Sequence, residues 1–203
     1  MKLCCWLLGV LLLLVLHGEH GAVGLLQTTP EEASCSTDHE CPDELQNLIK
    51  NELQLLNSSA DALLNVYNTA QGEPFSITNE KLCNPCVKTF PPFHADGQPK
   101  DKLVELYRII AYLSTSLSNI WQYQKSLNPY DQDLHSNLNS TVGNLQGLLN
   151  HVLCHLCKTY QVGHVDVVPV PDTSGMNTFQ QKRLGCQLLA KYKQVIVELV
   201  QAF

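Results

Sequence analysis

Four stretches of this chain carry apolar residues that recur every three or four positions. This spacing places the apolar side chains on one face of an α-helix. It predicts helices over about residues 43–70, 99–127, 133–160 and 177–203. Gly72 and Pro74 end the first stretch, and Asn128-Pro129 ends the second. The stripe of the last stretch comprises Leu188, Leu189, Tyr192, Val195, Ile196, Leu199 and Val200. The sequence therefore predicts an all-α protein.

The lengths of the three connections restrict how these helices can pack. About five residues join the second helix to the third, so these two must be antiparallel neighbours. About 28 residues follow the first helix and about 15 precede the last, enough in each case to span a helix of roughly 40 Å. Antiparallel neighbours do not need such long links, so we interpret both as crossover loops. The pattern predicts an up-up-down-down bundle, the arrangement of growth-hormone-like cytokines.

Residues 1–24 have the features of a secretory signal peptide that is removed. Lys2 is followed by an apolar run from Trp6 to Leu16 and by the small-residue sequence Ala22-Val23-Gly24. A membrane-spanning helix needs about 20 apolar residues, and no later segment approaches that length. We therefore expect a secreted, extracellular product, one domain over residues 25–203, and no insertion into a membrane.

The cysteines provide a test of this topology. Of nine cysteines, two lie in the predicted signal peptide, and an exported chain is expected to pair the others. The remaining seven are Cys35, Cys41, Cys83, Cys86, Cys154, Cys157 and Cys186. In the predicted bundle, the two that precede the first helix lie at the same end as Cys154 and Cys157. At the other end, Cys186 can pair with Cys83 or Cys86. The topology predicts two crosslinks at one end, one at the other, and one thiol left over.

No motif in the sequence requires an enzyme, a cofactor or a metal ion. The two C-x-x-C pairs fall at opposite ends of the predicted bundle, whereas a zinc ribbon needs both at one ion. His151 and His155 are spaced like the zinc ligands of a protease helix, but Val152 stands where that motif has glutamate. We therefore expect solvent-facing histidines. The net charge of −6, without a dense basic patch, argues against a nucleic-acid partner.

Several residues outside the apolar stripes are candidates for surface functions. Phe179 lies opposite Leu188 on the last helix, with Lys182 one turn further on. Periodicity leaves open whether Phe179 packs under the first crossover or is an exposed contact. Leu48 and Leu55 lie beside the stripe of the first helix, as part of a wider core or as an exposed apolar strip. Asn57 and Asn139 begin N-x-S/T sequons and are expected to carry glycans at exposed positions.

Five segments of the chain resemble one family of cytokines. They are YNTAQGEPF at 67–75, FPPFHADG at 90–97, KLVELYRII at 102–110, VGHVDV with PDTSG at 162–175, and LGCQLLAKYKQ at 184–194. They resemble the leukaemia inhibitory factor branch of the interleukin-6 family. The resemblance implies a long-chain four-helix bundle cytokine without catalysis, acting as a monomeric ligand. Such a ligand joins the leukaemia inhibitory factor receptor to the shared signal transducer glycoprotein 130 and activates JAK–STAT signalling in differentiation, proliferation and survival.

The same resemblance assigns roles to individual residues. The receptor-specific F-x-x-K motif corresponds to Phe179 and Lys182. The implied face for the shared transducer comprises Leu48, Asn51, Leu55, Gly147, Asn150 and His151. The implied disulfides are Cys35–Cys157, Cys41–Cys154 and Cys83–Cys186, which leaves Cys86 as a free thiol. The alternative function is that of another secreted helical binding protein or a disulfide-handling protein.

Overall fold

The computed structural model describes residues 35, 41–77, 79–85, 87 and 89–203. The predicted signal peptide, and Cys86 with its expected free thiol, lie outside the described residues. Four long helices form the domain: α1 (Leu45–Gln71), α3 (Pro99–Leu127), α4 (Gln132–Tyr160) and α5 (Thr178–Ala202). A short helix, α2 (Asn79–Leu82), lies within the first crossover, where periodicity predicts only a loop. The described residues contain no β-strand.

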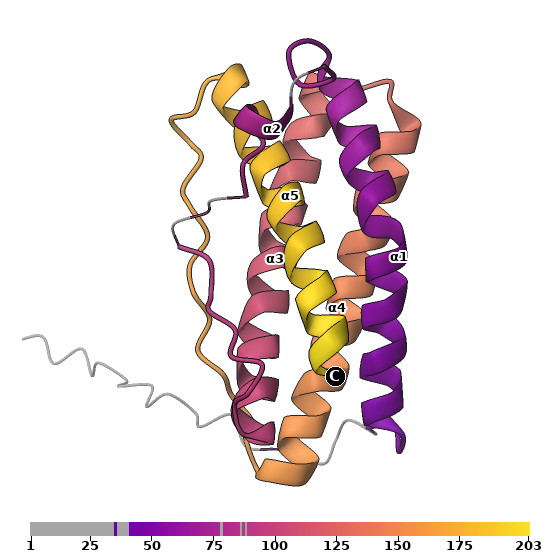
Figure 1. Cartoon of the computed structure of the whole chain (residues 1–203), viewed down its shortest axis with the longest axis vertical. Helices are drawn as coiled ribbons and strands as arrows, with labels where there is room; N and C mark the ends of the chain where they lie inside the picture. Colours follow the sequence, from indigo (N-terminus) through magenta and orange to yellow (C-terminus); the bar gives the residue numbers. More distant parts are fainter. Residues whose placement is uncertain (1–34, 36–40, 78, 86, 88) are drawn as a thin grey trace, which may run out of the picture. The chain divides into compact units, whose positions relative to one another are not determined.

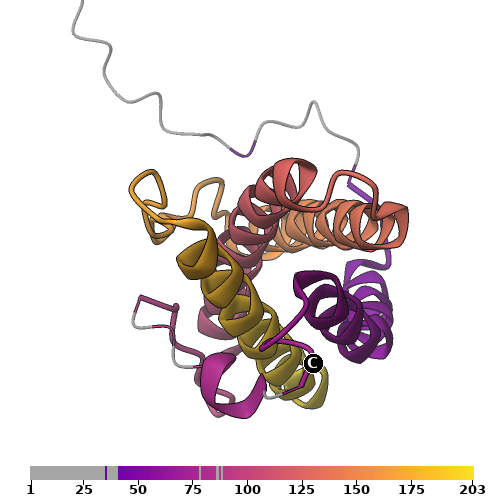
Figure 2. The ribbon, with the colours of Figure 1, turned by 90° about the horizontal axis from the view of Figure 1, so that it is seen from above.

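The four long helices pack as an up-up-down-down bundle (Figure 1), which confirms the predicted fold class. α1 and α3 run upward in this view, whereas α4 and α5 run downward. α1 packs against α4 and α5, and α3 packs against the same two helices. Seen along the bundle in Figure 2, the helices surround one common centre. The upper end in Figure 1 is thus where α1 and α3 end and α4 and α5 begin.

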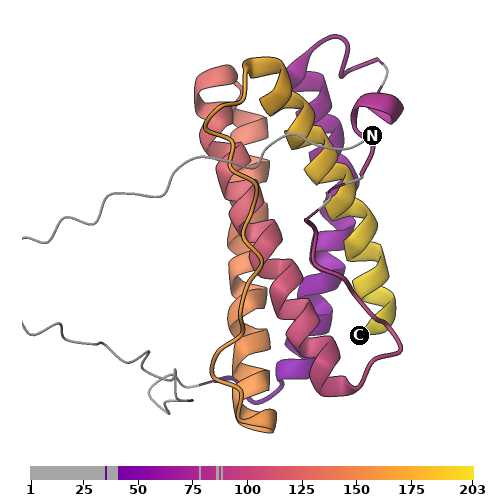
Figure 3. The same cartoon turned by 90° about the vertical axis from the view of Figure 1, so that its left-hand side faces the viewer.

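Both long connections travel the length of the bundle, as crossover loops must. Figure 3 shows the segment between α4 and α5 running from the lower end to the upper end. The guanidinium Nε of Arg108 on α3 donates to the carbonyl oxygen of Asp166 at 3.1 Å, and Val165 beside it is buried. In the first crossover, Phe75 and Cys83 are buried in the core. Each loop is therefore anchored by side chains that enter the bundle.

Each long helix contributes one buried stripe to a single core. The largest fully buried side chains are Tyr67, Tyr112, Tyr192, Phe75, Ile49, Leu53, Leu56, Leu63, Leu106, Ile109, Ile110 and Leu113. The hydroxyl of Tyr192 donates to the carbonyl oxygen of Leu56 at 3.1 Å, which satisfies a polar group inside the α1–α5 contact. The predicted stripe residue Val200 is only partly buried.

Local sequence signals set the helix ends. Gly72 follows α1 with φ 69° and ψ −168°, a conformation that side chains disfavour, so glycine suits this stop. Asp131 caps α4 by accepting a hydrogen bond from the backbone N–H of Leu134 at 3.0 Å. At the start of α5, Asn177 and Gln180 form a reciprocal capping box. These caps satisfy N–H groups that have no partner within the helix.

Among the described residues, three disulfides crosslink the bundle at its two ends. Cys35–Cys157 and Cys41–Cys154 join the chain before α1 to the end of α4. Cys83–Cys186 joins the first crossover to α5. These are the pairs that the family resemblance implies. They also select Cys83 over Cys86 as the partner of Cys186, a choice that topology alone left open.

A pair of leucines on α1 tests the core. Leu53 is fully buried, whereas Leu55 is 52% exposed. We expect Leu53→Ala to lower the free energy of unfolding by about 2–5 kcal/mol, because it leaves a cavity. Leu55→Ala should change it by less than about 0.5 kcal/mol, because water already covers that side chain. Denaturant unfolding measures both values, and equal losses in the two variants would contradict the packing.

Candidate receptor-binding surfaces

Phe179 stands exposed in the first turn of α5, between Asn177 and Gln180 of the capping box. Its side chain is 47% exposed, and its ring centroid lies 5.5 Å from that of Phe75. Phe75 itself is only 1% exposed. Periodicity left open whether Phe179 packs under the first crossover or is exposed, and each possibility holds for part of the ring. One face of the Phe179 ring packs on the first crossover, and the remainder is accessible to another molecule.

Lys182, one turn further along α5, is held by the end of α1. Its Nζ donates to the carbonyl oxygen of Gln71 at 3.0 Å, and its own carbonyl oxygen accepts from the Tyr67 hydroxyl at 3.1 Å. Gln71 is the last residue of α1, where the carbonyl groups lack helical partners and the helix dipole favours a cation. Phe179 and Lys182 together are called the α5 surface below. The ammonium group of Lys182 therefore has a defined position before any partner binds.

A buried polar network lies directly beneath the α5 surface. The side chain of Gln71 donates to the side-chain oxygen of Gln124 on α3 at 3.1 Å, and both residues are nearly inaccessible. Burial raises the pKa of Tyr67 far above its ordinary value, so this phenol remains a hydrogen-bond donor. The end of α1 is therefore tied to α3 through one side chain and to α5 through Lys182.

The second candidate surface lies along the contact between α1 and α4. Nδ1 of His151 lies 3.0 Å from Oε2 of Glu52, and both side chains are about a quarter exposed (24% and 23%). His151 is thus not the freely solvated side chain that its position in the sequence predicts. Glu52 on α1 thus contacts a side chain of α4 directly. Gly147, one turn before His151, leaves room for this carboxylate, since a Cβ there would lie 3.3 Å from Oε1 of Glu52.

The other residues implied for the shared transducer surround this pair. Leu55 is 52% exposed, Asn51 and Asn150 are exposed, and Leu48 is half-buried. The two leucines therefore differ: Leu48 is partly covered, whereas Leu55 is exposed apolar surface. We call Leu48, Asn51, Leu55, Gly147, Asn150 and His151 the α1/α4 face. Sequence reasoning missed Glu52, whose position is apparent only when α1 and α4 are packed together.

The two sequons lie on helices and differ in exposure. Asn139 on α4 is exposed, whereas Asn57 on α1 is half-buried. At about 100° per residue, Asn139 lies on nearly the same side of α4 as Asn150, about 16 Å away along the axis. Glycosylation at both positions remains a prediction.

The other cysteines and histidines that the sequence singled out make structural contacts. Cys154 and Cys157 are in disulfides, and the buried Cys83–Cys186 bridge does not favour a disulfide-handling function. Among the residues that the structure describes, no three His, Cys, Asp or Glu side chains gather as a metal site would require. His155 stacks on Tyr160, with ring centroids 6.5 Å apart and an interplanar angle of 11°.

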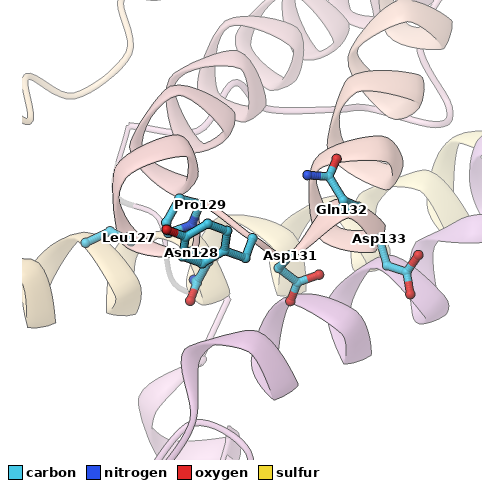
Figure 4. A pocket seen from close by; sticks show the side chains of 7 residues that line it. Leu127, Asn128, Pro129, Asp131, Gln132 and Asp133 are labelled. Carbon is cyan, nitrogen blue, oxygen red and sulfur yellow. The ribbon is translucent and has the colours of Figure 1, made fainter.

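The turn between α3 and α4 forms a shallow hollow (Figure 4), lined by the consecutive residues 127–133. Figure 4 shows the carboxylates of Asp131 and Asp133 at its edge. Asp131 is the helix cap of α4, so its carboxylate already has a structural partner. The hollow thus belongs to one turn of the chain and brings together no side chains from distant elements.

Comparison with known protein families identifies the chain. The model of the LIF / OSM family matches residues 44–203, which contain the whole bundle. The chain belongs to the LIF / OSM family. It is therefore a cytokine of the interleukin-6 type, from a family of secreted, non-enzymatic proteins that bind cytokine receptors. Within the described part of the chain, no helix has both the length and the apolar character needed to cross a membrane.

We expect His155 to make the stability of this cytokine depend on pH. Burial lowers the pKa of His155 below its ordinary value near 6.5. In the unfolded chain, His155 therefore takes up a proton at a higher pH than in the folded protein. The stabilising contribution is complete above about pH 6.5 and is lost as the pH falls through the folded pKa. His155→Phe keeps an aromatic ring against Tyr160 but cannot titrate.

The measurement is the difference in unfolding free energy between the wild type and His155→Phe, followed from pH 7.5 to pH 5. We expect the wild type to lose stability relative to the variant as the pH falls. The pKa of His94 is raised by its hydrogen bond to Glu105 and contributes with the opposite sign, but both proteins contain it. A difference that does not change with pH would show that His155 is not responsible.

Proposed function

We propose that this cytokine binds the leukaemia inhibitory factor receptor through the α5 surface and glycoprotein 130 through the α1/α4 face. By bringing the two receptors together, it activates JAK–STAT signalling in cell differentiation, proliferation and survival. The observation that carries the proposal is the position of Phe179. A large aromatic side chain is 47% exposed, next to a lysine that is hydrogen-bonded to α1, on a helix that a disulfide joins to the first crossover.

The placement of the two surfaces supports binding of two receptors by a single copy of the chain. The α5 surface lies at the upper end of the bundle in Figure 1, where α5 begins beside the end of α1. The α1/α4 face lies on the side formed by α1 and α4. Leu55 and Gly147 lie several turns from the ends of these helices. Receptors on the two surfaces need not occupy the same space. A monomeric ligand is therefore sufficient to join them.

The physical character of the α5 surface suits a binding hot spot. Hot spots are typically aromatic or basic side chains that enter a desolvated pocket on the partner. Phe179 loses little conformational freedom on binding, because its ring already rests on Phe75. The remaining exposed part of the ring is apolar surface that a receptor pocket can remove from water.

Replacement of Phe179 tests the first contact. We expect Phe179→Ala to weaken binding to the leukaemia inhibitory factor receptor ectodomain by at least about 30-fold, or about 2 kcal/mol. Binding to the glycoprotein 130 ectodomain should not change. The matched control is Val197→Ala, which removes an apolar side chain that is 41% exposed on the same helix. Surface plasmon resonance with each ectodomain measures both affinities.

Circular dichroism and thermal unfolding accompany this measurement. If Phe179→Ala melts much earlier but binds normally per folded molecule, the residue serves the fold and not the receptor. Lys182→Ala is a less specific variant, because its Nζ also caps the end of α1. We expect that variant to lose both affinity and some stability.

Leu55 tests the second contact. Leu55→Ala should retain the wild-type stability and bind the leukaemia inhibitory factor receptor normally, but bind glycoprotein 130 more weakly by about 1 kcal/mol or more, that is, at least about fivefold. In cells that carry both receptors, STAT phosphorylation should require a correspondingly higher cytokine concentration. Val197→Ala again serves as the control. Unchanged glycoprotein 130 affinity in Leu55→Ala, and also in Asn150→Arg, would remove the α1/α4 face from the proposal.

A further inference from the structure

The first turns of α5 are fastened to the last turn of α1 by three adjacent contacts. The Tyr67 hydroxyl donates to the carbonyl oxygen of Lys182 at 3.1 Å, and Nζ of Lys182 donates to the carbonyl oxygen of Gln71 at 3.0 Å. The third contact involves Gly185, one turn after Lys182, which is buried against Tyr67. Lys182 is thereby held at both its main chain and its side chain.

Gly185 is the position where a side chain cannot be accommodated. A Cβ on this residue would overlap the hydroxyl of Tyr67 and lie 2.5 Å from Cζ of the same ring. The ring cannot swing out into solvent without leaving the core, because Tyr67 is fully buried. Glycine lowers the helix propensity of α5 here, so its presence needs a packing reason. The reason is close approach: the phenol of α1 occupies the space that a side chain of α5 would take.

We propose that Tyr67 and Gly185 are positioning residues for the receptor contact. Their close contact sets the height and tilt of the first two turns of α5 relative to α1, and so the location of Phe179 and Lys182. This inference rests on the proposed binding of the leukaemia inhibitory factor receptor by the α5 surface. Phe179 lies six residues before Gly185, about 9 Å along the helix axis, so a change in tilt at Gly185 displaces its ring.

Comparing the affinities for the two receptors distinguishes a positioning role of Tyr67 and Gly185 from a general structural role. Leu55 is twelve residues before Tyr67, about 18 Å away along α1, and Gly147 belongs to a different helix. A local shift at the start of α5 should therefore weaken only the receptor that binds the α5 surface. A loss of folding would weaken both receptors in proportion to the unfolded fraction.

The experiment uses four variants of the full chain. Gly185→Ala introduces the overlapping Cβ, and Gly185→Ala with Tyr67→Leu removes the ring that it meets. Tyr67→Phe keeps the ring and removes only the hydrogen bond to Lys182. Gly143→Ala is the matched control, because a Cβ at this helical glycine has nothing within 4 Å. Affinities for both receptor ectodomains and thermal unfolding are measured for each variant.

We expect Gly185→Ala to bind the leukaemia inhibitory factor receptor at least about tenfold more weakly, because a shifted anchor loses its pocket. Tyr67→Phe should lose about two- to tenfold, the usual contribution of one hydrogen bond. The double variant Gly185→Ala with Tyr67→Leu should bind more tightly than Gly185→Ala alone. Glycoprotein 130 affinity should stay within about twofold in all of them, as should both affinities of Gly143→Ala.

Each failure has a distinct result. If the wild type does not bind the leukaemia inhibitory factor receptor, the proposed function is wrong. If the wild type binds and Phe179→Ala does not, but Gly185→Ala and Tyr67→Phe bind normally, the function stands and the positioning role is wrong. Equal losses for both receptors, without rescue by Tyr67→Leu, would make the contact purely structural. If Gly185→Ala does not fold, Tyr67→Phe alone decides by the same comparison of receptors.

Discussion

The parallel direction of α1 and α3, and of α4 and α5, is the constraint on which this structure depends. Two consecutive parallel helices oblige the chain to return along the whole bundle, and it does so twice. A loop of that length gains stability only if it buries apolar groups of its own. Here Phe75, Cys83 and Val165 enter the core from the two crossovers. The loops are therefore part of the packed domain, and the first one supplies the support on which Phe179 rests.

The upper end of the bundle is organised around the last turn of α1. The side chain of Gln71 is hydrogen-bonded to Gln124 of α3, while its main-chain carbonyl accepts from Lys182 of α5. Tyr67, one turn earlier, fills the space beside Gly185. Buried polar groups are costly when unpaired, so a network of this kind favours one relative placement of the helices over others. A receptor that binds the start of α5 would contact a surface whose geometry is set before binding.

The two candidate surfaces differ in how they are built. At the α5 surface, Phe179 is exposed because it lies in the first helical turn, beyond the stripe that faces the core. On the α1/α4 face, the accessible groups flank the contact between Glu52 and His151, which bridges two helices. The first surface is a single aromatic side chain beside a lysine that is hydrogen-bonded to α1. The second is a more polar strip, with Leu55 as its exposed large apolar side chain.

The sequence by itself determined the four helices, their topology and the ends at which cysteines could meet. Those properties depend on apolar periodicity and connection length, which are local in the chain. It also showed that Phe179 lies outside the stripe of α5, but it could not say how much of the ring is covered. Only the tertiary structure decided that Phe75 supports one face of it, that His151 pairs with Glu52, and that Lys182 caps α1. These contacts join residues that are 99 to 111 positions apart in the chain. The physical reason is that such contacts depend on the height and rotation of packed helices, and periodicity specifies neither.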